Sequence, residues 1–376
     1  MKKFTYLIFI LCCALFSCSD DDQNSGGGEL KISGQVFSPN NEFPISRANV
    51  KVFKGEQLIS QVTTDALGNF VAEELPEGDL RVVMSKGKFS RTIDINLEAD
   101  YTITESQRNF DTFPKIAVVQ GSYDYIEDIL MGIGVVDPLT GAPAFDYVSG
   151  AGGRNASDFG RHGHGESTAR PSTITPNVTF GVAELLNTPG LLATYDIIFF
   201  NCSVNDELHG NAVAMDNLKT FVNNGGIIYA TDWMYTYVRS MFPMDYLNFA
   251  WPEKGGDSNQ ALATLGSADL EDWLEAQGIT VTPNVLVEGF LGGWQLVDSF
   301  NADNVDAWVI AESVTYDNQM LTDKPLAFTF GYGCGGVFYS SFHTHGNNSA
   351  SDAIDQMMSY FVFELSGLGT DCSAGN

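Results

Sequence analysis

The spacing of apolar runs changes once along this chain of 376 residues, and that change constrains the fold more than any other feature. Before about residue 100, short β-rich runs alternate closely with turn sequences, which is typical of an antiparallel β-sandwich. After residue 114, strand-like runs alternate with helical patterns, which favours a sheet with helices on both faces. The sequence therefore predicts a multi-domain chain: a small antiparallel β-sandwich, followed by an α/β doubly wound, mostly parallel sheet.

The β-rich part is expected to form a domain over residues 30–105. Asp65, Gly68 and the pair Pro76-Glu77 belong to residue types that favour turns, and they separate the apolar runs. Between the turns, β-branched and apolar residues predict six strands, at residues 30–37, 48–53, 58–64, 69–72, 80–84 and 91–97.

This domain resembles the carboxypeptidase-regulatory-like, transthyretin-like family of β-sandwiches. The resemblance is carried by Gly34-Gln35-Val36, by Ala48-Asn49-Val50-Lys51-Val52, by Thr64-Asp65 with Gly68 and Phe70, and by Leu75-Pro76-Glu77-Gly78. It implies a fold and no chemistry, because such modules usually act as spacers or adhesion platforms. We therefore expect a stalk that lifts the next domain off a membrane.

The second domain is expected over residues 114–367, with a tail at residues 368–376. Residues 243–305 are less regular than their surroundings, and Gly225-Gly226 forms a typical helix stop. Strands are predicted at residues 115–120, 145–148, 196–201, 227–231, 308–312, 326–332 and 337–342, and helices at residues 123–132, 182–192, 213–222, 269–277 and 353–365.

This half resembles the class I glutamine-amidotransferase-like superfamily, especially its degenerate members near the trehalose-utilisation-like proteins. The resemblance implies a flavodoxin/amidotransferase-like fold. The matching segments are Lys115-Ile116-Ala117-Val118-Val119, Tyr195-Asp196-Ile197-Ile198-Phe199-Phe200-Asn201, Phe221-Val222-Asn223-Asn224-Gly225-Gly226 and Val337-Phe338-Tyr339-Ser340-Ser341-Phe342-His343.

One departure from that family concerns its activity. An active amidotransferase carries a nucleophilic cysteine on a tight strand-to-helix turn flanked by small residues. Here the turn contains Asp232 in the place of the cysteine, followed by the bulky Trp233 and Met234. Cys202 follows a different strand, also without small flanks, and is interpreted as a semi-buried thiol at a strand end. Glutaminase activity is therefore not expected.

The N-terminus has the pattern of an export signal at residues 1–17. Lys2 and Lys3 precede an apolar run at residues 7–16, which is shorter than the roughly twenty residues of a membrane-spanning helix. The sequence up to Cys18 resembles a lipobox, which implies lipidation of Cys18 and a membrane anchor. The alternative is an ordinary signal peptide with an incidental cysteine.

Residues 18–29 are expected to form a flexible acidic and glycine-rich tether. Within it, Ser19-Asp20-Asp21-Asp22 resembles the tag that sends some Gram-negative lipoproteins to the outer face of the outer membrane. The predicted location is therefore the cell envelope, on the exposed side of the outer membrane. Without the resemblance, the same residues are a solvated acidic linker.

The charge of the chain excludes one class of partner. Asp and Glu number 47 against 19 Lys and Arg, giving a formal charge of −28. Phosphate contacts need clustered Lys and Arg, so a nucleic-acid partner is not expected. Beyond the N-terminus the cysteines are Cys202, Cys334 and Cys372, an odd number, and Cys334 with Cys372 is the plausible disulfide.

Ligands of open α/β sheets bind at the carboxyl ends of the strands, where loops and helix N-termini meet. All five histidines fall on loops predicted at that edge. Several aromatic residues are also candidates for stacking on a sugar, with core packing as the alternative: Trp233, Tyr235, Tyr237, Trp251 and Trp294. The candidate ligand-binding residues at this edge are Ser122, Asp124, Asn205, Asp206, Glu207 and Trp233.

Imidazole and carboxylate groups are common ligands of zinc and similar divalent metals. One predicted metal set is His343 and His345 with Asp232, and a weaker one is His162 and His164 with Glu166. Without a metal, Asp232 and His343 could act as a catalytic pair. The structural alternative is that loop histidines are solvated and that His343 is a hydrogen-bonded core residue.

Three functions follow from these patterns. The first is a cell-surface lipoprotein whose degenerate amidotransferase-like domain binds a ligand, with carbohydrate as one candidate, and has no glutaminase activity. The second is a metal-assisted hydrolase that uses the histidine and aspartate cluster. The third is a structural envelope component whose α/β domain contacts another protein. A divalent metal is the one cofactor that the sequence suggests.

Overall fold

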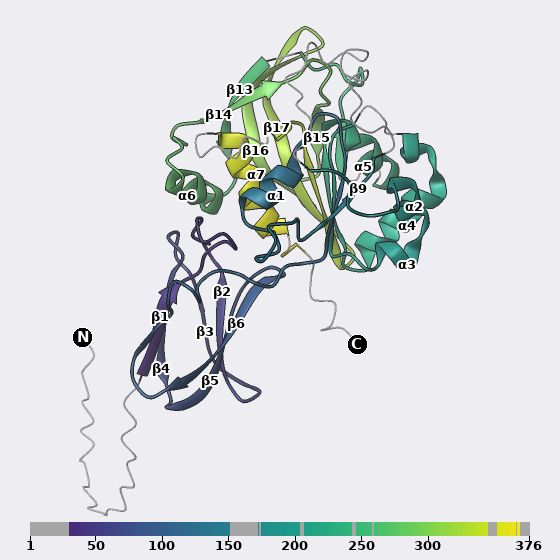
Figure 1. Cartoon of the computed structure of the whole chain (residues 1–376). Coiled ribbons are helices and arrows are strands. Elements are labelled where there is room, and N and C mark those ends of the chain that lie inside the picture. Colours follow the sequence, from purple (N-terminus) through teal and green to yellow (C-terminus); the bar gives the residue numbers. More distant parts are fainter. Residues whose placement is uncertain are drawn as a thin grey trace, which may run out of the picture.

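The computed structural model describes residues 30–150, 172, 174–203, 207–242, 246–257, 259–344, 352–365 and 367–368. The predicted signal peptide, Cys18 and the tether lie outside these residues. In Figure 1 a β-sandwich lies below a larger α/β domain. Among the described residues, no helix combines the length and the apolar character needed to cross a bilayer.

The N-terminal domain is a sandwich of two sheets, which confirms the sequence prediction. One sheet has the order β4-β1-β7 and the other β3-β2-β5-β6. Alternate residues of β5, among them Leu80, Val82 and Met84, are buried between the sheets, as the two-residue period of a strand requires. The strands are β1 (Leu30–Gln35), β2 (Asn49–Lys54), β3 (Gln57–Thr63), β4 (Asn69–Leu75), β5 (Gly78–Lys86), β6 (Phe89–Leu97) and β7 (Tyr101–Thr102), of which β7 was not predicted.

The α/β domain is built on a nine-stranded sheet with the order β14-β13-β16-β17-β18-β11-β10-β8-β9. The five strands from β18 to β9 are parallel to one another. These parallel strands are β8 (Ile116–Val119), β9 (Asp146–Val148), β10 (Ile197–Phe200), β11 (Ile227–Thr231) and β18 (Gly335–Ser340).

The other four strands of the sheet are antiparallel, so the predicted mostly parallel sheet is a mixed one. Two-residue connections, Asp317-Asn318 and Gly333-Cys334, join β16 to β17 and β17 to β18. Such short links can join only antiparallel strands, because a parallel crossover needs a dozen or more residues. The antiparallel strands are β13 (Asn259–Leu265), β14 (Val285–Phe290), β16 (Val305–Tyr316) and β17 (Gln319–Tyr332), and a separate pair is formed by β12 (Leu247–Phe249) and β15 (Val297–Phe300).

Helices cover both faces of the sheet (Figure 1), as the strand–helix alternation predicted. In β8, Ile116 and Val118 pack with α1, α6 and α7, whereas Ala117 and Val119 pack with α2, α4 and α5. The helices are α1 (Ile126–Gly132), α2 (Val182–Asn187), α3 (Pro189–Leu192), α4 (Ala212–Asn223), α5 (Tyr235–Met241), α6 (Ala268–Ala276) and α7 (Ala353–Leu365), with 3-10 turns η1 (Glu207–Gly210) and η2 (Asp232–Met234).

Two details differ from the predicted elements. The helix predicted over residues 182–192 is two helices, because Pro189 cannot donate a backbone hydrogen bond and begins α3 instead. The irregular stretch at residues 243–305 contains β12 to β15 in addition to the predicted α6.

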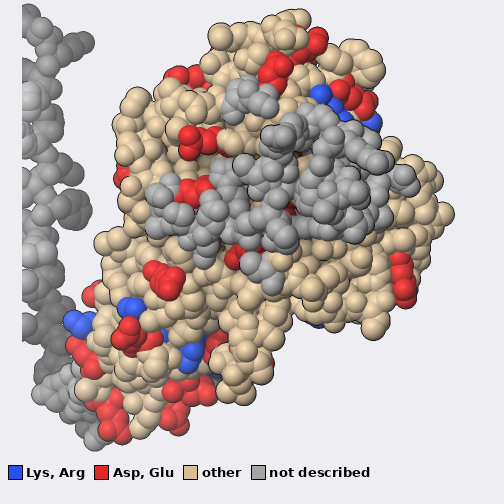
Figure 2. All heavy atoms as spheres, turned by 45° about the horizontal axis from the view of Figure 1, so that its top comes forward, with Lys and Arg blue, Asp and Glu red and all other residues tan. Residues whose placement is uncertain are grey.

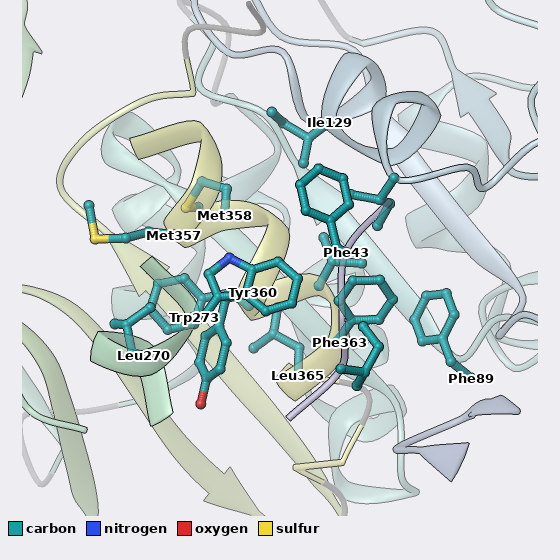
Figure 3. Close-up of a cluster of buried hydrophobic side chains, with 14 of the residues drawn as sticks. Phe43, Phe89, Ile129, Leu270, Trp273, Met357, Met358, Tyr360, Phe363 and Leu365 are labelled. Atoms are coloured by element: carbon teal, nitrogen blue, oxygen red, sulfur yellow. The ribbon is translucent and has the colours of Figure 1, made fainter. Parts of the chain in front are cut away.

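The two domains share one hydrophobic core (Figure 3). Phe43 stacks on Trp273 of α6 with ring centroids 5.8 Å apart. Phe89 of β6 meets Phe363 of α7 edge to face at 5.1 Å. The expected stalk is therefore packed directly against the α/β domain.

Ion pairs surround this shared core. Lys86 lies 2.7 Å from Glu364 at the end of α7, and Lys88 lies 2.6 Å from Asp196, which precedes β10. Residues before β10 and at the end of α7 lie at the amino ends of the parallel strands. The sandwich therefore packs beneath that edge and leaves the carboxyl ends facing away from it (Figure 1).

Asn40 of the sandwich completes the end of α1. Its Nδ2 donates to the carbonyl of Gly132 at 2.7 Å, and its backbone N–H donates to Ile133 at 3.2 Å. We expect Asn40→Ala to lower the free energy of unfolding by about 1 kcal/mol, because Gly132 loses a partly buried hydrogen bond. Urea unfolding measures the change, with Asn96→Ala as the control, since the Asn96 side chain donates to the nearby exposed Glu98 at the same end of β6. Equal midpoints for the two variants would contradict this role of Asn40.

Candidate functional site

Three reactive side chains meet at the carboxyl edge of the parallel strands. Cys202 follows β10, Asp232 follows β11 and His343 follows β18. These strands are neighbours in the order β18-β11-β10, with Phe200 beside Ala230 and Thr231 beside Ser340. The residues just beyond the strand ends are therefore brought together although they are far apart in sequence.

The donor atoms of these side chains are close and buried. His343 Nε2 lies 3.2 Å from Asp232 Oδ2, and the Cys202 thiol donates to the same oxygen at 3.9 Å. The atoms all lie within 4.8 Å of one another. Asp232 and Cys202 are fully buried, and His343 is 5% exposed.

Asp232 occupies a strained turn between β11 and η2. Its φ is +41°, in the left-handed region that non-glycine residues adopt at an energetic cost. Its Oδ1 accepts a hydrogen bond from Gln295 N at 2.7 Å, and its carbonyl accepts one from the Tyr339 hydroxyl at 3.2 Å. The turn is tight although Trp233 and Met234 are bulky. The hydrogen bonds from Gln295 and Tyr339 fix the orientation of the Asp232 carboxylate.

Nearby charges shift the pKa of the Cys202 thiol in opposite directions. Burial raises the pKa of Cys202 well above its usual value, and the Asp232 carboxylate raises it further. Lys254 lowers the same pKa, and its Nζ lies 4.0 Å from the ring centroid of Trp233. The raising causes are the larger ones, so the net shift of the Cys202 pKa is upward and Lys254 offsets only part of it.

Two buried carboxylates lie behind this cluster. Asp124 Oδ1 accepts hydrogen bonds from the backbone and hydroxyl of Thr344, one residue beyond His343. Glu127 accepts from Tyr147 at 3.0 Å and from Asn201 at 2.8 Å. These contacts link the loop after β18 to α1 and restrict the position of His343.

Several predicted site residues lie in the described part of the chain. Ser122 is buried, and its backbone N–H donates to Cys202 at 2.8 Å. Asp124 is fully buried beside Thr344, as given above. Trp233 is 4% exposed, and its indole donates to the Gly293 carbonyl at 2.7 Å, so its ring does not offer an open face to a sugar.

Other predictions lie outside the described residues. The weaker metal set cannot be placed, and neither can the second histidine of the favoured set. Glu207 begins η1, but its side chain is outside the described part. Cys334 is disulfide-bonded and Cys202 is free, while the pairing of Cys334 with Cys372 stays a prediction. The predictions without a described position are His162, His164, Glu166, Asn205, Asp206 and His345.

Sequence reasoning missed three contributors to the site. Cys202 was interpreted only as a thiol at a strand end, although its place after β10 matches that of Asp232 after β11. Gln295 and Lys254 come from the irregular stretch between β12 and β15, where no pattern marked them. Gln295 also accepts from Lys254 N at 2.7 Å, so it connects the carboxylate to the loop that carries the lysine.

A cavity of about 520 Å³ lies at the amino edge of the parallel strands, opposite the reactive side chains. Its lining includes Lys88, Tyr195, Asp196 and Gly225, which lie near the amino ends of the strands. The Lys88–Asp196 ion pair crosses this region, so the cavity belongs to the junction between the domains. The reactive side chains lie at the other edge, and we therefore place the candidate site there.

Comparison with solved structures gives matches of low similarity. A cytoplasmic protein of Salmonella typhimurium is 14% identical over 74% of this chain and 93% of its own, with a TM-score of 0.33. A ThuA-like protein of Parabacteroides merdae is 10% identical over 68% of this chain and 88% of its own, also at 0.33. The 5-hydroxyisourate hydrolase of Klebsiella pneumoniae is 16% identical over 22% of this chain and 96% of its own, at 0.18.

Comparison with curated protein sequences gives no match. One family is found at the N-terminal side, where the resemblance had placed it. Residues 31–111 match the carboxypeptidase regulatory-like domain, and the strands of the sandwich lie almost entirely within these residues. Over these residues the N-terminal part of this chain is therefore similar to the carboxypeptidase regulatory-like domain.

Proposed function

We propose that the α/β domain holds a divalent metal ion at Cys202, Asp232 and His343 and acts as a metal-assisted hydrolase. The observation that carries the proposal is the convergence of thiol, carboxylate and imidazole donors from three neighbouring strand ends. Sequence reasoning supplied Asp232 and His343 for this site. Cys202 joins them in the fold.

The spacing of the donors fits zinc. Four-coordinate zinc holds sulfur at about 2.3 Å and nitrogen or oxygen at about 2.0 Å, so neighbouring ligand atoms are roughly 3.3–3.6 Å apart. The distances of 3.2 Å from His343 and 3.9 Å from Cys202 to Asp232 Oδ2 bracket that range. Three protein ligands also leave a fourth position open, which is the pattern of catalytic rather than structural zinc sites.

A divalent cation at this position would supply Lewis-acid chemistry and activate water for hydrolysis near neutral pH. Residues of the chain orient the ligand groups. Gln295 N donates to Asp232 Oδ1, so Asp232 Oδ2 faces His343 and Cys202. Thr344 and Asp124 restrict the loop behind His343. Lys254 places a positive charge nearby, where it could attract an anionic or polarised oxygen of a substrate.

The proposed location follows from the N-terminal sequence. Lipid on Cys18 would tether the chain to the envelope, on the exposed side of the outer membrane. The sandwich packs against the amino ends of the strands, so a tether on its side leaves the carboxyl edge pointing away from the membrane. Figure 2 shows more acidic than basic side chains on both domains, which suits an exported protein better than a nucleic-acid binder.

Metal content tests the proposed function directly. The mature chain carrying Cys18→Ser, purified without added histidines, is expected to contain about one zinc, manganese or iron ion per molecule by elemental mass spectrometry. His343→Ala should reduce the content to about a tenth or less, because one of the ligands is lost. His209→Ala is the matched control, since His209 lies on η1 and outside the cluster, and should keep the metal. A chain that binds no metal after incubation with each ion would overturn the proposal.

The burial of the cluster favours a second candidate, a ligand-binding domain without turnover. Asp232 and Cys202 are fully buried and His343 is 5% exposed, which leaves little room for a substrate at the donor atoms. Asp232 also stands where the resemblance expects the glutaminase nucleophile. A chain that holds metal but hydrolyses no ester, amide or glycoside in a substrate screen would support this candidate over the hydrolase.

A further inference from the structure

Trp251 is the one fully exposed tryptophan of the five in the chain, at 82% exposure. The other four each donate their indole N–H to a protein acceptor, at Gly293, Gln356, Asp257 and Thr329. Packing and internal hydrogen bonding therefore account for the positions of four tryptophans but not for that of Trp251. Its exposed ring is accessible for stacking on a ligand.

Trp251 lines a cavity of about 420 Å³ between β12 and the hairpin of β16 and β17. The remaining wall combines apolar rings with polar side chains that reach solvent. Phe249 and Tyr316 supply the rings, while Asn248, Asp298, Asp317 and Gln319 supply hydrogen-bonding groups. Lys and Arg do not occur among the described residues that line it.

Hydrogen bonds hold the backbone of the loop that carries Trp251. The Tyr316 hydroxyl donates to the Pro252 carbonyl at 2.6 Å and accepts from Gly255 N at 3.1 Å. Asp317 N donates to Gly255 at 2.7 Å, and Ala250 N donates to Leu296 at 2.9 Å. The backbone that carries the exposed ring is therefore held in place, so little backbone entropy would be lost when a ligand stacks on the ring.

We infer that this cavity is a binding site for neutral carbohydrate. An indole face covers the C–H side of a pyranose ring, and carboxylate and amide side chains accept and donate hydrogen bonds at its hydroxyls. The Asp317 carboxylate and the formal charge of −28 disfavour uronic acids and other anionic sugars, whereas the Asp298 carboxylate is paired with Lys324 at 2.8 Å. The ligand class is therefore a neutral glycan, bound weakly through one stacked sugar.

The glycan site is distinct from the metal cluster but joined to it by Gln295. Gln295 N donates to Asp232, and its side chain donates to the carbonyl of Ala250, the residue before Trp251, at 3.0 Å. The inference goes beyond the proposed hydrolase, because a non-catalytic domain could also carry this site. If both hold, a polysaccharide would be anchored near the carboxyl edge.

Affinity electrophoresis of the mature chain in gels with soluble polysaccharides tests the inference. Laminarin, xyloglucan, galactomannan and starch are the neutral probes, and polygalacturonate is the acidic one. At least one neutral probe should retard the protein. Trp251→Ala should weaken that binding at least about tenfold, because stacking on the ring is lost. Gln319→Ala should weaken it less, because it removes one hydrogen-bonding group.

Met320→Ala is the matched control, since Met320 is 75% exposed on β17 and does not line the cavity. It should bind like the unmodified chain. Retardation by no neutral probe, by polygalacturonate alone, or equally with Trp251→Ala would overturn the inference. Metal content is measured on the same variants and should not change, so failure here is distinguishable from failure of the proposed metal site.

Discussion

Replacing Phe89 with alanine is expected to lower the free energy of unfolding by about 3–5 kcal/mol, the usual range for a buried phenylalanine. Phe89 lies in the sandwich but is fully buried in the core that both domains share. Its ring centroid lies 5.1 Å from that of Phe363 of α7 (Figure 3). The ring centroids of Phe110 and Phe113 lie 6.3 and 6.2 Å away. The cavity left by alanine would therefore lie between the domains.

All five tryptophans belong to the α/β domain, which makes their fluorescence a specific reporter. In chemical unfolding, Phe89→Ala in the sandwich should shift the tryptophan transition of the other domain to lower denaturant. Leu58→Ala is the control, because Leu58 lies on β3 of the same sandwich and is 46% exposed. If the tryptophan transition stays in place while the far-ultraviolet signal of the sandwich changes, the domains are not stabilised by a common core.

Substitution of Asp232 is expected to separate metal binding from folding. Asp232→Asn keeps an oxygen for the Gln295 N–H and tolerates the positive φ, but it loses the charge that a metal ion requires. We expect metal affinity to fall at least about a hundredfold while the fold is kept. Asp232→Ala also removes the acceptor of the Gln295 N–H and the buried carboxylate beside His343, and should cost about 3–5 kcal/mol of folding free energy.

Elemental analysis and thermal unfolding measure the two effects on the same samples. Asp146→Asn is the matched control, because Asp146 is a partly buried carboxylate at the start of β9, paired with Lys115 at 2.6 Å. It lies on the same sheet at the amino edge and should keep the metal. Full metal content in Asp232→Asn would remove Asp232 from the ligand set.

Patterns of neighbouring residues gave the local elements correctly. The sandwich strands follow from alternation, and α7 was predicted with its observed bounds, Ala353–Leu365. Asp232 and His343 were expected together because both follow strands predicted as central. This inference succeeds because the carboxyl ends of adjacent parallel strands meet in space, whatever lies between them in sequence.

The antiparallel half of the sheet was not foreseen. One of its hairpin links, Asp317-Asn318 between β16 and β17, carries no glycine, although both residues adopt positive φ. Asparagine and aspartate tolerate that conformation without marking the turn as clearly as glycine does. The strands β12 to β15 are short or interrupted, so no apolar period identified them.

The sequence by itself determined the order of the two domains, the strand and helix character of most segments, and the edge where reactive residues lie. These properties depend on neighbours within a few residues, through alternation, helical period and turn-forming side chains. Tertiary structure alone decided that Cys202 joins Asp232 and His343, that Gln295 reaches Asp232 across 63 residues, and that Phe89 packs on α7. Such contacts depend on strand order and domain packing, which bring together residues that no local pattern relates.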